Sequence, residues 1–520
     1  MAAFRIPCFL FLLLSLSFPG SSSSSSSLSS STLRSREING VCKTTPFPET
    51  CIESLKLSLS LNIPTTILAS LLQTLRIAVT EGGKLSNLLS GAALVERQRG
   101  TLQDCRELHG ITISLLSKSI SRIGSIADAR KLADVRTFLS AALTNRGTCF
   151  EGLSSAGGRD KPAILASFDS VYKYVSNSLS WVSNPGLIRV GKNRRLLGKY
   201  RRILQSSGQI LTVAADGSGN FTAVADAVNF APSNSNERVV IYVKAGVYEE
   251  NVDIPSWKTN IALIGDGKDA TVITGNRSVA DGWTTFRSAT VAVSGDGFLA
   301  RDIRFENTAG PEKHQAVALR INADYAAVYR STIVGYQDTL YAHSLRQFFR
   351  ECDIYGTVDY IFGNAAVVFQ ACNIISRMPM PSQFTVITAQ GREDPDQNTG
   401  ISLQNCTILA TDDLYSNSST VKSYLGRPWK NYSRTVVIES YVDDFVAPEG
   451  WTNWSGDQGL DTLYYGEYQN NGPGSGTDGR VSWAGFHLMN YSDAAHFTVS
   501  EFITGQEWLD STSVPYDDYV

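Results

Sequence analysis

Hydrophobic and polar positions follow two different patterns along this 520-residue chain, and the change falls near residue 205. In the region 38–185, stretches such as ILASLLQTLRIAV and DVRTFLSAALTNRGTCFEGL place apolar residues three and four positions apart. That spacing puts them on one face of an α-helix. Antiparallel helices with such faces pack as bundles. The first half is therefore predicted to be an all-α four-helix bundle.

The region 205–520 replaces the helical pattern with glycine, asparagine and β-branched residues. A weak repeat runs through the segments RDIRFEN, STIVGY, CDIYGT, CNIISR and CTILAT. A unit of about 20 residues with loop insertions is typical of a solenoid of stacked strands. We therefore predict an all-β parallel β-helix; the alternative is coincidence among many β-branched residues. The shared isoleucines, separated by 30, 21, 20 and 34 residues, are Ile303, Ile333, Ile354, Ile374 and Ile408.

The repeat places two aspartates at equivalent positions. Asp338 in GYQDTLY and Asp359 in GTVDYIF each follow one of the shared isoleucines by five residues. Because stacked strands are about 4.8 Å apart, we expect a carboxylate pair on neighbouring coils. Two nearby carboxylates resist ionising together, which separates their pKa values. One can then act as a proton donor while the other attacks as an anion.

Three further polar residues are candidates for the same site. Gln315 in HQAVALR precedes Gln337 by 22 residues, close to one coil, and their amides can donate hydrogen bonds to an oxyanion. Arg427 in LGRPW can hold a carboxylate through two hydrogen bonds. Taken singly, a glutamine also fits a polar ladder that stabilises a solenoid, and the arginine fits a surface charge. Together they fit attack on an acyl carbon without a serine, a histidine or a metal.

Three aromatic residues, Tyr341, Phe362 and Trp429, lie close to these polar residues in the sequence. They are either packing side chains or, beside a polar cleft, rings that stack on sugars. No CxxC pair and no His/Cys cluster has the spacing of a zinc site. No metal and no cofactor are therefore predicted.

The net charge of −3 conceals two oppositely charged parts: residues 1–204 carry +14 and residues 205–520 carry −17. Attraction between them is expected. The joint, 186–204, includes the basic stretch VGKNRRLLGKYRRIL. It is either a solvated linker or a processing site for a secretory-pathway protease. The two candidate motifs are Arg194-Arg195-Leu196-Leu197 and Arg201-Arg202-Ile203-Leu204.

The chain begins with features of a secreted protein. Residues 1–27 hold Arg5, the apolar run PCFLFLLLSLSFPG and the start of a serine-rich stretch, which together are typical of a signal peptide. An uncleaved signal anchor is the alternative. Asn-x-Ser/Thr sequons favour the same route. The glycosylation candidates are Asn220, Asn276, Asn405, Asn417, Asn431, Asn453 and Asn490.

An oxidising compartment makes disulfides expected. Cys8 leaves with the signal peptide, and four of the other cysteines lie in the helical half, where three pairings are open. In the second half, Cys352 and Cys372 take equivalent positions on adjacent coils. The strand spacing falls within the Cα separations of disulfides, so these two cysteines can be bridged. The helical-half cysteines are Cys42, Cys51, Cys105 and Cys149.

Several of these segments resemble the signature of plant pectin methylesterase precursors, the type that carries an inhibitor-like pro-region. VCKTTPFPETC and DVRTFLSAALTNRGTC in the first half are similar to pectinesterase-inhibitor domains. The matching segments of the second half, in order, are GVYEE (246–250), HQAVALR (314–320), GYQDTLYAHS (335–344), GTVDYIFGN (356–364) and LGRPW (425–429).

The resemblance implies a right-handed parallel β-helix that hydrolyses methyl esters of homogalacturonan to methanol and free carboxylate in the cell wall. It assigns the nucleophile to Asp359 and the acid/base to Asp338. It assigns oxyanion stabilisation to Gln315 and Gln337, and orientation of the nucleophile to Arg427. It also implies that Tyr341, Phe362 and Trp429 line the substrate groove.

The same resemblance implies the bridges Cys42–Cys51, Cys105–Cys149 and Cys352–Cys372 and leaves Cys406 free. RRLL resembles the processing motif of the family, with Arg195, Leu197, Arg202 and Leu204 as the residues at the two candidate cuts. Tyr360 departs from the phenylalanine common after the nucleophile, and GLIRVGKN before RRLL is atypical.

A secreted, cell-wall protein is expected, with pectin as substrate. Its other expected partners are a secretory-pathway processing protease and separate inhibitor proteins; nucleic acid is not expected, and a monomer is. The N-terminal half is expected either to inhibit the enzyme or to assist folding and export. The competing functions are a pectin lyase or glycosidase, and a wall or inhibitor protein whose catalytic half has decayed.

Overall fold

The computed structural model describes residues 40–60, 67–123, 128–184, 187–188 and 210–520. The expected signal peptide and serine tract lie outside the described residues. Both candidate cleavage motifs, in the stretch 189–209, lie outside them as well.

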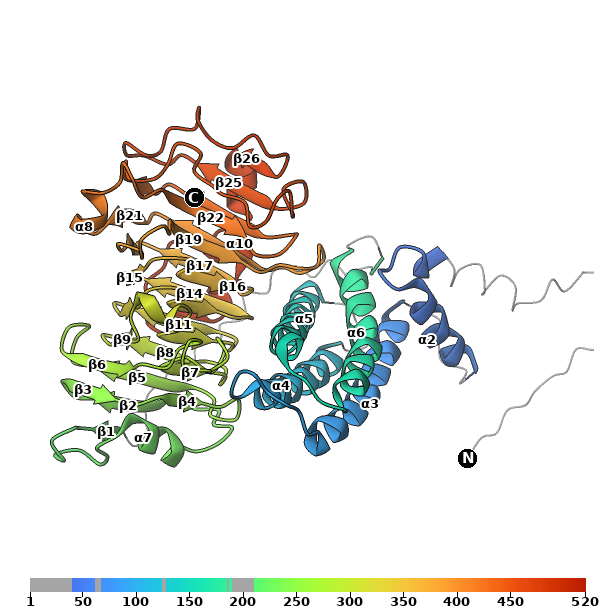
Figure 1. The fold of residues 1–520 in the computed structure, drawn as a ribbon. Helices are drawn as coiled ribbons and strands as arrows, with labels where there is room; N and C mark the ends of the chain where they lie inside the picture. The colour runs from blue at the N-terminus through green and yellow to red at the C-terminus, as the bar shows by residue number, and fades with distance from the viewer. Residues whose placement is uncertain (1–39, 61–66, 124–127, 185–186, 189–209) are drawn as a thin grey trace, which may run out of the picture.

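The described part of the first half folds into four long helices, preceded by a shorter one (Figure 1). Each long helix buries one face in a common core, for which Leu75, Leu116, Leu139 and Val175 are fully buried examples. This confirms the bundle that the three-and-four spacing predicts. The helices are α2 Pro48–Ser60, α3 Ile67–Gly91, α4 Thr101–Arg122, α5 Ala129–Ser155 and α6 Lys161–Ser183.

Two disulfides fix this bundle. Cys42–Cys51 ties the chain before α2 to the helix itself, with the Cα atoms 5.5 Å apart. Cys105–Cys149 joins α4 to α5, with the Cα atoms 4.8 Å apart. Both pairs are those that the resemblance implies. The second bridge places the C-terminal half of α5 against α4, which matters for the site described below.

The second half is a right-handed parallel β-helix built from three sheets in which the strands of successive coils pair in parallel. Along each coil the chain passes from one sheet to the next. The largest sheet has eleven strands: β1 Leu211–Val213, β2 Val239–Val243, β5 Ile261–Gly265, β8 Leu299–Arg301, β11 Ala326–Tyr329, β14 Arg346–Arg350, β17 Ala366–Gln370, β20 Gly400–Gln404, β23 Arg434–Ile438, β25 Tyr464–Tyr468 and β26 Phe486–Leu488.

The two other sheets have seven and eight strands. We call the first the inward sheet, because it faces the helical bundle: β4 Val252–Ile254, β7 Val291–Val293, β10 Leu319–Ile321, β13 Leu340–Ala342, β16 Ile361–Gly363, β19 Thr385–Gln390 and β22 Ser423–Pro428. The other holds β3 Gly246–Glu249, β6 Thr271–Gly275, β9 Arg304–Asn307, β12 Thr332–Val334, β15 Asp353–Gly356, β18 Asn373–Ser376, β21 Thr407–Ala410 and β24 Tyr441–Val442.

Short helices close and flank the coils. In the described part they are α7 Val224–Phe230, α8 Asp412–Tyr415, α9 Tyr491–Ala495 and α10 Val499–Phe502, with short 3-10 turns at Pro311–Lys313, Gly505–Glu507 and Leu509–Ser511. α7 covers the first coil, and α10 with the chain after it packs its apolar residues on the largest sheet. None of the helices in the described ranges has the length and apolar character needed to cross a membrane.

The register of the strands tests the sequence repeat. Ile333, Ile354, Ile374 and Ile408 pair with one another in succession through β12, β15, β18 and β21, as predicted. Ile303 does not belong to this column, because Ile333 pairs with Phe305. The prediction was wrong for that coil because the column requires a large buried apolar side chain, which phenylalanine provides as well as isoleucine.

The expected Cys352–Cys372 bridge is absent, and both residues are buried free thiols, as is Cys406. Their strands are stacked in register, so the three side chains form one column. In-register parallel strands hold equivalent Cβ atoms roughly 4.8 Å apart, whereas a disulfide needs about 3.8 Å. Each thiol instead lies within hydrogen-bonding distance of backbone carbonyls, for example Cys352 Sγ and Arg350 O at 3.3 Å.

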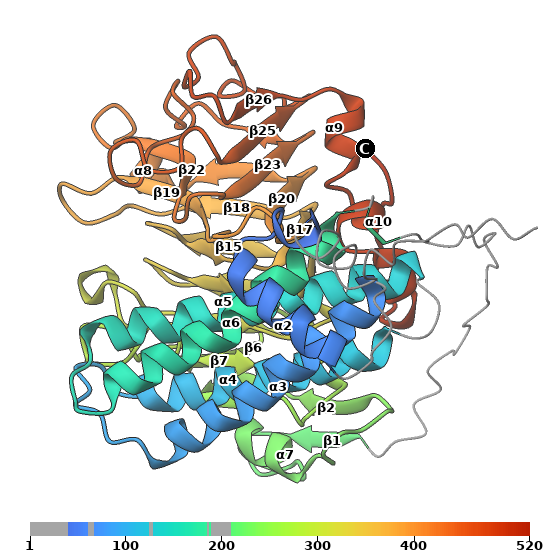
Figure 2. The same cartoon turned by 90° about the vertical axis from the view of Figure 1, so that its right-hand side faces the viewer.

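The helical bundle lies against one side of the β-helix, with α4 and α5 nearest to it (Figures 1 and 2). Leu108 of α4 belongs to one buried apolar cluster with outward side chains of the inward sheet, including Tyr341 and Phe362. Ile111 of α4 and Phe138 of α5 cluster with Leu345. The two oppositely charged halves are thus in direct contact.

Candidate active site

Along the strands of the inward sheet, successive side chains point alternately into the β-helix core and out toward the candidate site. In β13, Leu340 and Ala342 point into the β-helix core while Tyr341 between them points outward. In β16, Ile361 points inward and Phe362 outward. Because side chains alternate along a strand and the coils are in register, the outward residues form a continuous surface. Tyr341 pairs with Phe362 across the strands, and their rings stack with centroids 4.1 Å apart.

The two aspartates immediately precede these strands. Leu340 pairs with Ile361, so Asp338 and Asp359, two residues earlier in each motif, occupy equivalent turns on adjacent coils. Both have left-handed backbone angles, φ 62° and φ 52°, a conformation that aspartate tolerates better than most residues. The glycine that opens the second motif is also required: a Cβ on Gly356 would lie 2.1 Å from that of Tyr360.

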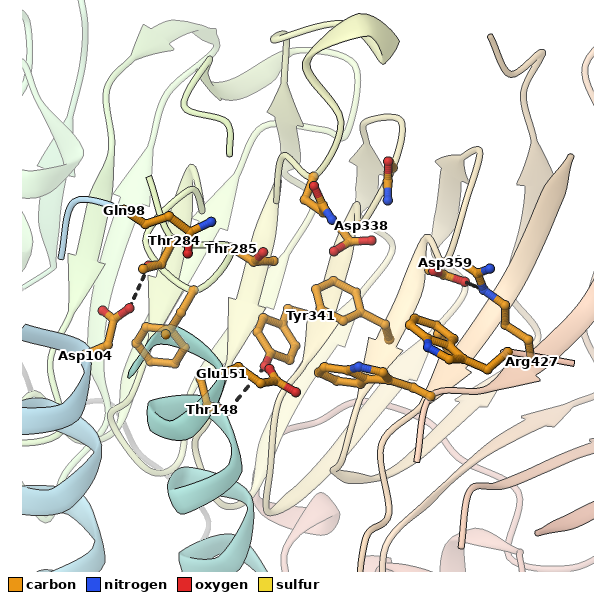
Figure 3. Close-up of a pocket in the computed structure, with 18 residues that line it drawn as sticks. Gln98, Asp104, Thr148, Glu151, Thr284, Thr285, Asp338, Tyr341, Asp359 and Arg427 are labelled. Atoms are coloured by element: carbon orange, nitrogen blue, oxygen red, sulfur yellow. Dashed lines mark hydrogen bonds and ion pairs between the residues drawn. The ribbon is translucent and has the colours of Figure 1, made fainter. Parts of the chain in front are cut away.

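Arg427 reaches Asp359 from β22, two strands further along the inward sheet. Its Nε donates to Asp359 Oδ1 at 2.8 Å and its Nη2 to Oδ2 at 2.6 Å, a bidentate pair (Figure 3). The guanidinium carbon lies 4.3 Å from the centroid of the Trp454 ring. This face-on contact fixes the arginine from its other side. The nucleophile candidate is therefore held in one orientation.

The two carboxyls differ in their electrostatic surroundings. Burial raises the pKa of Asp338 well above its usual value, the neighbouring Asp359 raises it further, and Arg427 lowers it. Burial also raises the pKa of Asp359, but the hydrogen bonds and charge of Arg427 lower it. The pKa of Asp338 is therefore the higher of the two. This is the division between a proton donor and an anion that the sequence predicts.

These residues share one cavity of about 440 Å³. Gln315 and Gln337, the candidates for oxyanion stabilisation, lie in its wall, as do the aromatic candidates Tyr341, Phe362 and Trp429. Eight residues that sequence reasoning proposed for the site are thus brought together. The full set is Gln315, Gln337, Asp338, Tyr341, Asp359, Phe362, Arg427 and Trp429.

The helical half completes the cavity wall. Thr148 and Glu151 project from α5, and Asp104 from α4 (Figure 3). Thr148 Oγ1 lies 3.4 Å from the Tyr341 hydroxyl and 2.9 Å from His343 Nε2. Glu151 Oε1 accepts a hydrogen bond from Lys430 Nζ at 2.7 Å. The cavity is therefore covered by side chains of the same chain.

A buried ionic contact closes the other end of the cavity. Asp104 accepts from Thr284 Oγ1 at 2.6 Å and from Arg287 Nε at 2.6 Å, and Arg287 also pairs with Glu107 of α4. Burial raises the pKa of Asp104 to about 6, although Arg287, the Thr284 hydroxyl and Arg320 act to lower it.

The loop before α4 adds a backbone contact between the halves. Arg99 forms a parallel bridge with Trp283, and its N–H donates to Gly282 O at 2.6 Å. Gln98 beside it lies in the cavity wall. Backbone pairing of this kind holds the bundle in one position on the β-helix.

Sequence reasoning missed the residues that the helices and neighbouring loops contribute. Thr148, Glu151 and Asp104 look like ordinary polar positions of amphipathic helices, and nothing local marks them. Lys430 carried a weak signal, since it directly follows the aromatic candidate Trp429.

Tyr360, the departure from the resembled pattern, is buried. Its hydroxyl lies 3.0 Å from the Ser376 Oγ. A buried hydroxyl without a partner would be destabilising, so this contact lets tyrosine replace the usual phenylalanine.

A parallel β-helix with an arginine-held carboxylate beside a carboxyl of higher pKa, in a cavity lined by stacked aromatics, has the features expected of a hydrolase that acts on sugar polymers. The family model described as "Pectinesterase" matches residues 210–506 of this chain. The family model described as "Plant invertase/pectin methylesterase inhibitor" matches residues 36–180. The chain belongs to the pectinesterase family and carries an N-terminal inhibitor-like domain, which we call the pro-domain.

Individual proteins agree with this assignment. The chain is 62% identical over 505 residues to the Arabidopsis thaliana protein named "Probable pectinesterase/pectinesterase inhibitor 12", with 92% of each covered. Among solved structures, the carrot pectin methylesterase is 54% identical, with a TM-score of 0.60 over 61% of this chain and 99% of that one. The Aspergillus niger pectin methylesterase is 33% identical, with a TM-score of 0.51 over 58% and 95%.

Proposed function

We propose that the β-helix hydrolyses the methyl esters of pectin through a covalent intermediate on Asp359. The observation that carries the proposal is the bidentate Arg427–Asp359 pair beside Asp338 in one cavity. Arg427 orients Asp359 and lowers its pKa against the effect of burial, while burial and the neighbouring Asp359 raise the pKa of Asp338 well above its usual value. We therefore assign the anion to Asp359 and the proton to Asp338. The reaction needs these two states at the same time.

The steps follow from these states. Asp359 attacks the carbonyl carbon of the ester, and the amides of Gln315 and Gln337 stabilise the oxyanion. The C–O bond to the methoxy group breaks as Asp338 gives its proton to the leaving oxygen, and methanol departs. Asp338, now ionised, takes a proton from water, whose oxygen attacks the acyl carbon. The bond to Asp359 breaks and the free uronate is released.

The test is methanol release from methyl-esterified pectin by residues 205–520. Asp359→Asn should nearly abolish release, because the amide is a poor nucleophile and no longer pairs ionically with Arg427. Circular dichroism should show that the variant remains folded. A folded variant with a near-normal rate would refute the assignment.

We also propose that the pro-domain keeps this site closed until it is cut away. The support is that Thr148 and Glu151 project into the cavity and that Asp104 seals its end. A tethered domain acts at high effective concentration, so contacts of modest strength suffice. Assistance in folding or export is compatible with the same contacts.

Changing both motifs, Arg194-Arg195 and Arg201-Arg202, to Ala-Ala tests this closure. The uncut chain is expected to accumulate with low methanol release, and the wild-type chain to mature. Full activity of a secreted, uncut chain would refute autoinhibition. Each motif changed alone shows which one the processing protease uses.

We further propose that the protein is secreted to the cell wall and glycosylated. All seven sequon asparagines are exposed on the β-helix, as an acceptor site requires. Treatment of the secreted protein with an N-glycosidase should lower its apparent mass. An unchanged mass would refute glycosylation.

A further inference from the structure

The pro-domain contacts the cavity with carboxylates at two separate points. At one end, Asp104 and Glu107 of α4 pair with Arg287. Near the other, Glu151 of α5, labelled in Figure 3, pairs with Lys430, which follows the cavity residue Trp429. In both pairs the anion belongs to the pro-domain and the cation to the β-helix. Removal of the pro-domain would leave Lys430 without the Glu151 carboxylate, and Arg287 with only the longer contact to Asp253 of the β-helix, whose Oδ2 lies 3.9 Å from Arg287 Nη1.

Pectin is itself a row of carboxyl groups, some free and some methylated. Burial and the neighbouring Asp359 raise the pKa of Asp338 well above its usual value, which favours the neutral form of this carboxyl beside the reacting ester. Arg427 is engaged by Asp359 within the β-helix. Arg427 is therefore not free to bind a free carboxylate of the polymer, whereas Arg287 and Lys430 become available once the pro-domain leaves.

We propose that Arg287 and Lys430 bind free carboxylates of de-esterified sugar units on either side of the reacting ester. In the uncut chain Asp104, Glu107 and Glu151 occupy the positions of those substrate carboxylates. The pro-domain thus closes the site partly as a mimic of the anionic polymer. This proposal rests on the proposed esterase function and adds to it the two residues that recognise free carboxylates near the reacting ester.

The surroundings of Lys430 fit this role. Its Nζ lies 2.7 Å from Glu151 Oε1 and 5.1 Å from the centroid of the Trp429 ring. A sugar stacked on that ring would place its carboxyl group within reach of the ammonium. Arg287 has a planar guanidinium that suits two-point contact with a carboxylate, and it already makes such contacts with two pro-domain acids.

The contribution of each cation to substrate binding can be judged from the exposed fraction of its side chain. The Lys430 side chain is 30% exposed and that of Glu151 40%. Ion pairs near the surface contribute up to about 1 kcal/mol, which corresponds to about fivefold in binding. Arg287 is only 10% exposed in the uncut chain, and a comparable or larger effect is expected there.

The experiment uses residues 205–520, which form a core of their own that includes buried residues from Leu211 to Tyr465. The carrot enzyme matches this part over 99% of its length without a pro-domain counterpart, so the part is expected to fold alone. The measured quantity is kcat/KM for methanol release on partly de-esterified pectin divided by that on fully esterified pectin.

Lys430→Gln and Arg287→Gln should each lower this ratio about fivefold, and the charge-conserving Lys430→Arg should change it less than twofold. Each glutamine variant should also weaken inhibition by unesterified oligogalacturonate. A ratio unchanged in the glutamine variants, or a parallel fall on both substrates, would overturn the proposal. Absence of methanol release by the unmodified chain would instead refute the esterase function itself.

A charge exchange in the full-length chain tests the mimicry separately. Glu151→Lys should raise the activity of the uncut chain, and adding Lys430→Glu should restore the closed state. Once its pro-domain is removed, the double variant should nevertheless show a lower ratio of kcat/KM on partly de-esterified to fully esterified pectin than the wild type. The reason is that a carboxylate at position 430 repels the carboxylates of the substrate. Restoration of the wild-type ratio by the double variant would contradict the proposal.

Discussion

At the residue scale, the site depends on how one arginine divides two carboxyls. Asp338 and Asp359 occupy equivalent turns, and burial raises the pKa of both. The difference is that Arg427 donates hydrogen bonds to both carboxylate oxygens of Asp359. Asp338 receives no such bond from Arg427, and the negative charge of Asp359 raises its pKa further. A repeated backbone position thus acquires two chemical roles from a side chain two strands away.

Asp338→Asn tests this division through pH. In the unmodified enzyme the rate should rise with pH as Asp359 ionises and fall at higher pH as Asp338 loses its proton. The variant should lose about 10²–10⁴-fold in rate, since it lacks a proton donor, and should also lose the fall at higher pH. Methanol release measured across pH checks both the lower rate and the loss of the fall. If the variant still loses activity at higher pH, that fall belongs to a group other than Asp338.

At the element scale, α5 carries the contacts that cover the cavity. The Cys105–Cys149 disulfide holds the helix at the residue after Thr148. The threonine hydroxyl is shared by Tyr341 and His343. Burial lowers the pKa of His343 well below its usual value, and nearby Arg320 lowers it further. The imidazole is therefore neutral and needs a neutral hydrogen-bonding partner, which Thr148 supplies.

Thr148→Val should loosen the docking of α5, because it leaves the buried His343 Nε2 without its partner at similar side-chain volume. Such a loss costs about 1–3 kcal/mol. We expect higher methanol release from the uncut chain and faster proteolysis between the halves. Thr148→Ser, which keeps the hydroxyl, is the matched control and should behave as wild type. A loosened docking in Thr148→Ser but not in Thr148→Val would show that the methyl group, not the hydroxyl, matters.

At the scale of the whole molecule, the docking of the two halves is linked to pH through Asp104. Its pKa is about 6 with the halves docked and near 3.9 for an ordinary aspartate. The docked state therefore binds the extra proton between these values. This contribution to docking is fully present below about pH 4 and is lost as pH rises through 6.

The charges facing Asp104 are Arg287 and, at longer range, Arg320, and both lower its pKa without outweighing burial. Two pKa units correspond to about a hundredfold in the docking equilibrium. Affinity between the separated halves should therefore fall by up to that factor from pH 4 to pH 7, as measured by titration calorimetry. Asp104→Asn should flatten this dependence. A wild-type affinity that rises over the same range would contradict the linkage.

Much of this protein follows from its sequence alone. Helical and solenoid periodicities are local properties, so they predict the bundle, the coils and the register of Ile333, Ile354 and Ile374. Equal offsets from that register place Asp338 and Asp359 side by side, because a parallel solenoid repeats each turn at a fixed spacing. Motif resemblance then supplied the roles of Gln315, Gln337 and Arg427.

Other features were decided only by the tertiary structure. Whether Cys352 and Cys372 are bridged depends on the separation of their Cβ atoms, which strand stacking sets and sequence spacing does not. The partners Thr148, Glu151 and Asp104 come from helices whose polar residues look alike in sequence. Which of them face the cavity is determined by how the bundle docks. That docking is the sum of many long-range contacts, and no local pattern encodes it.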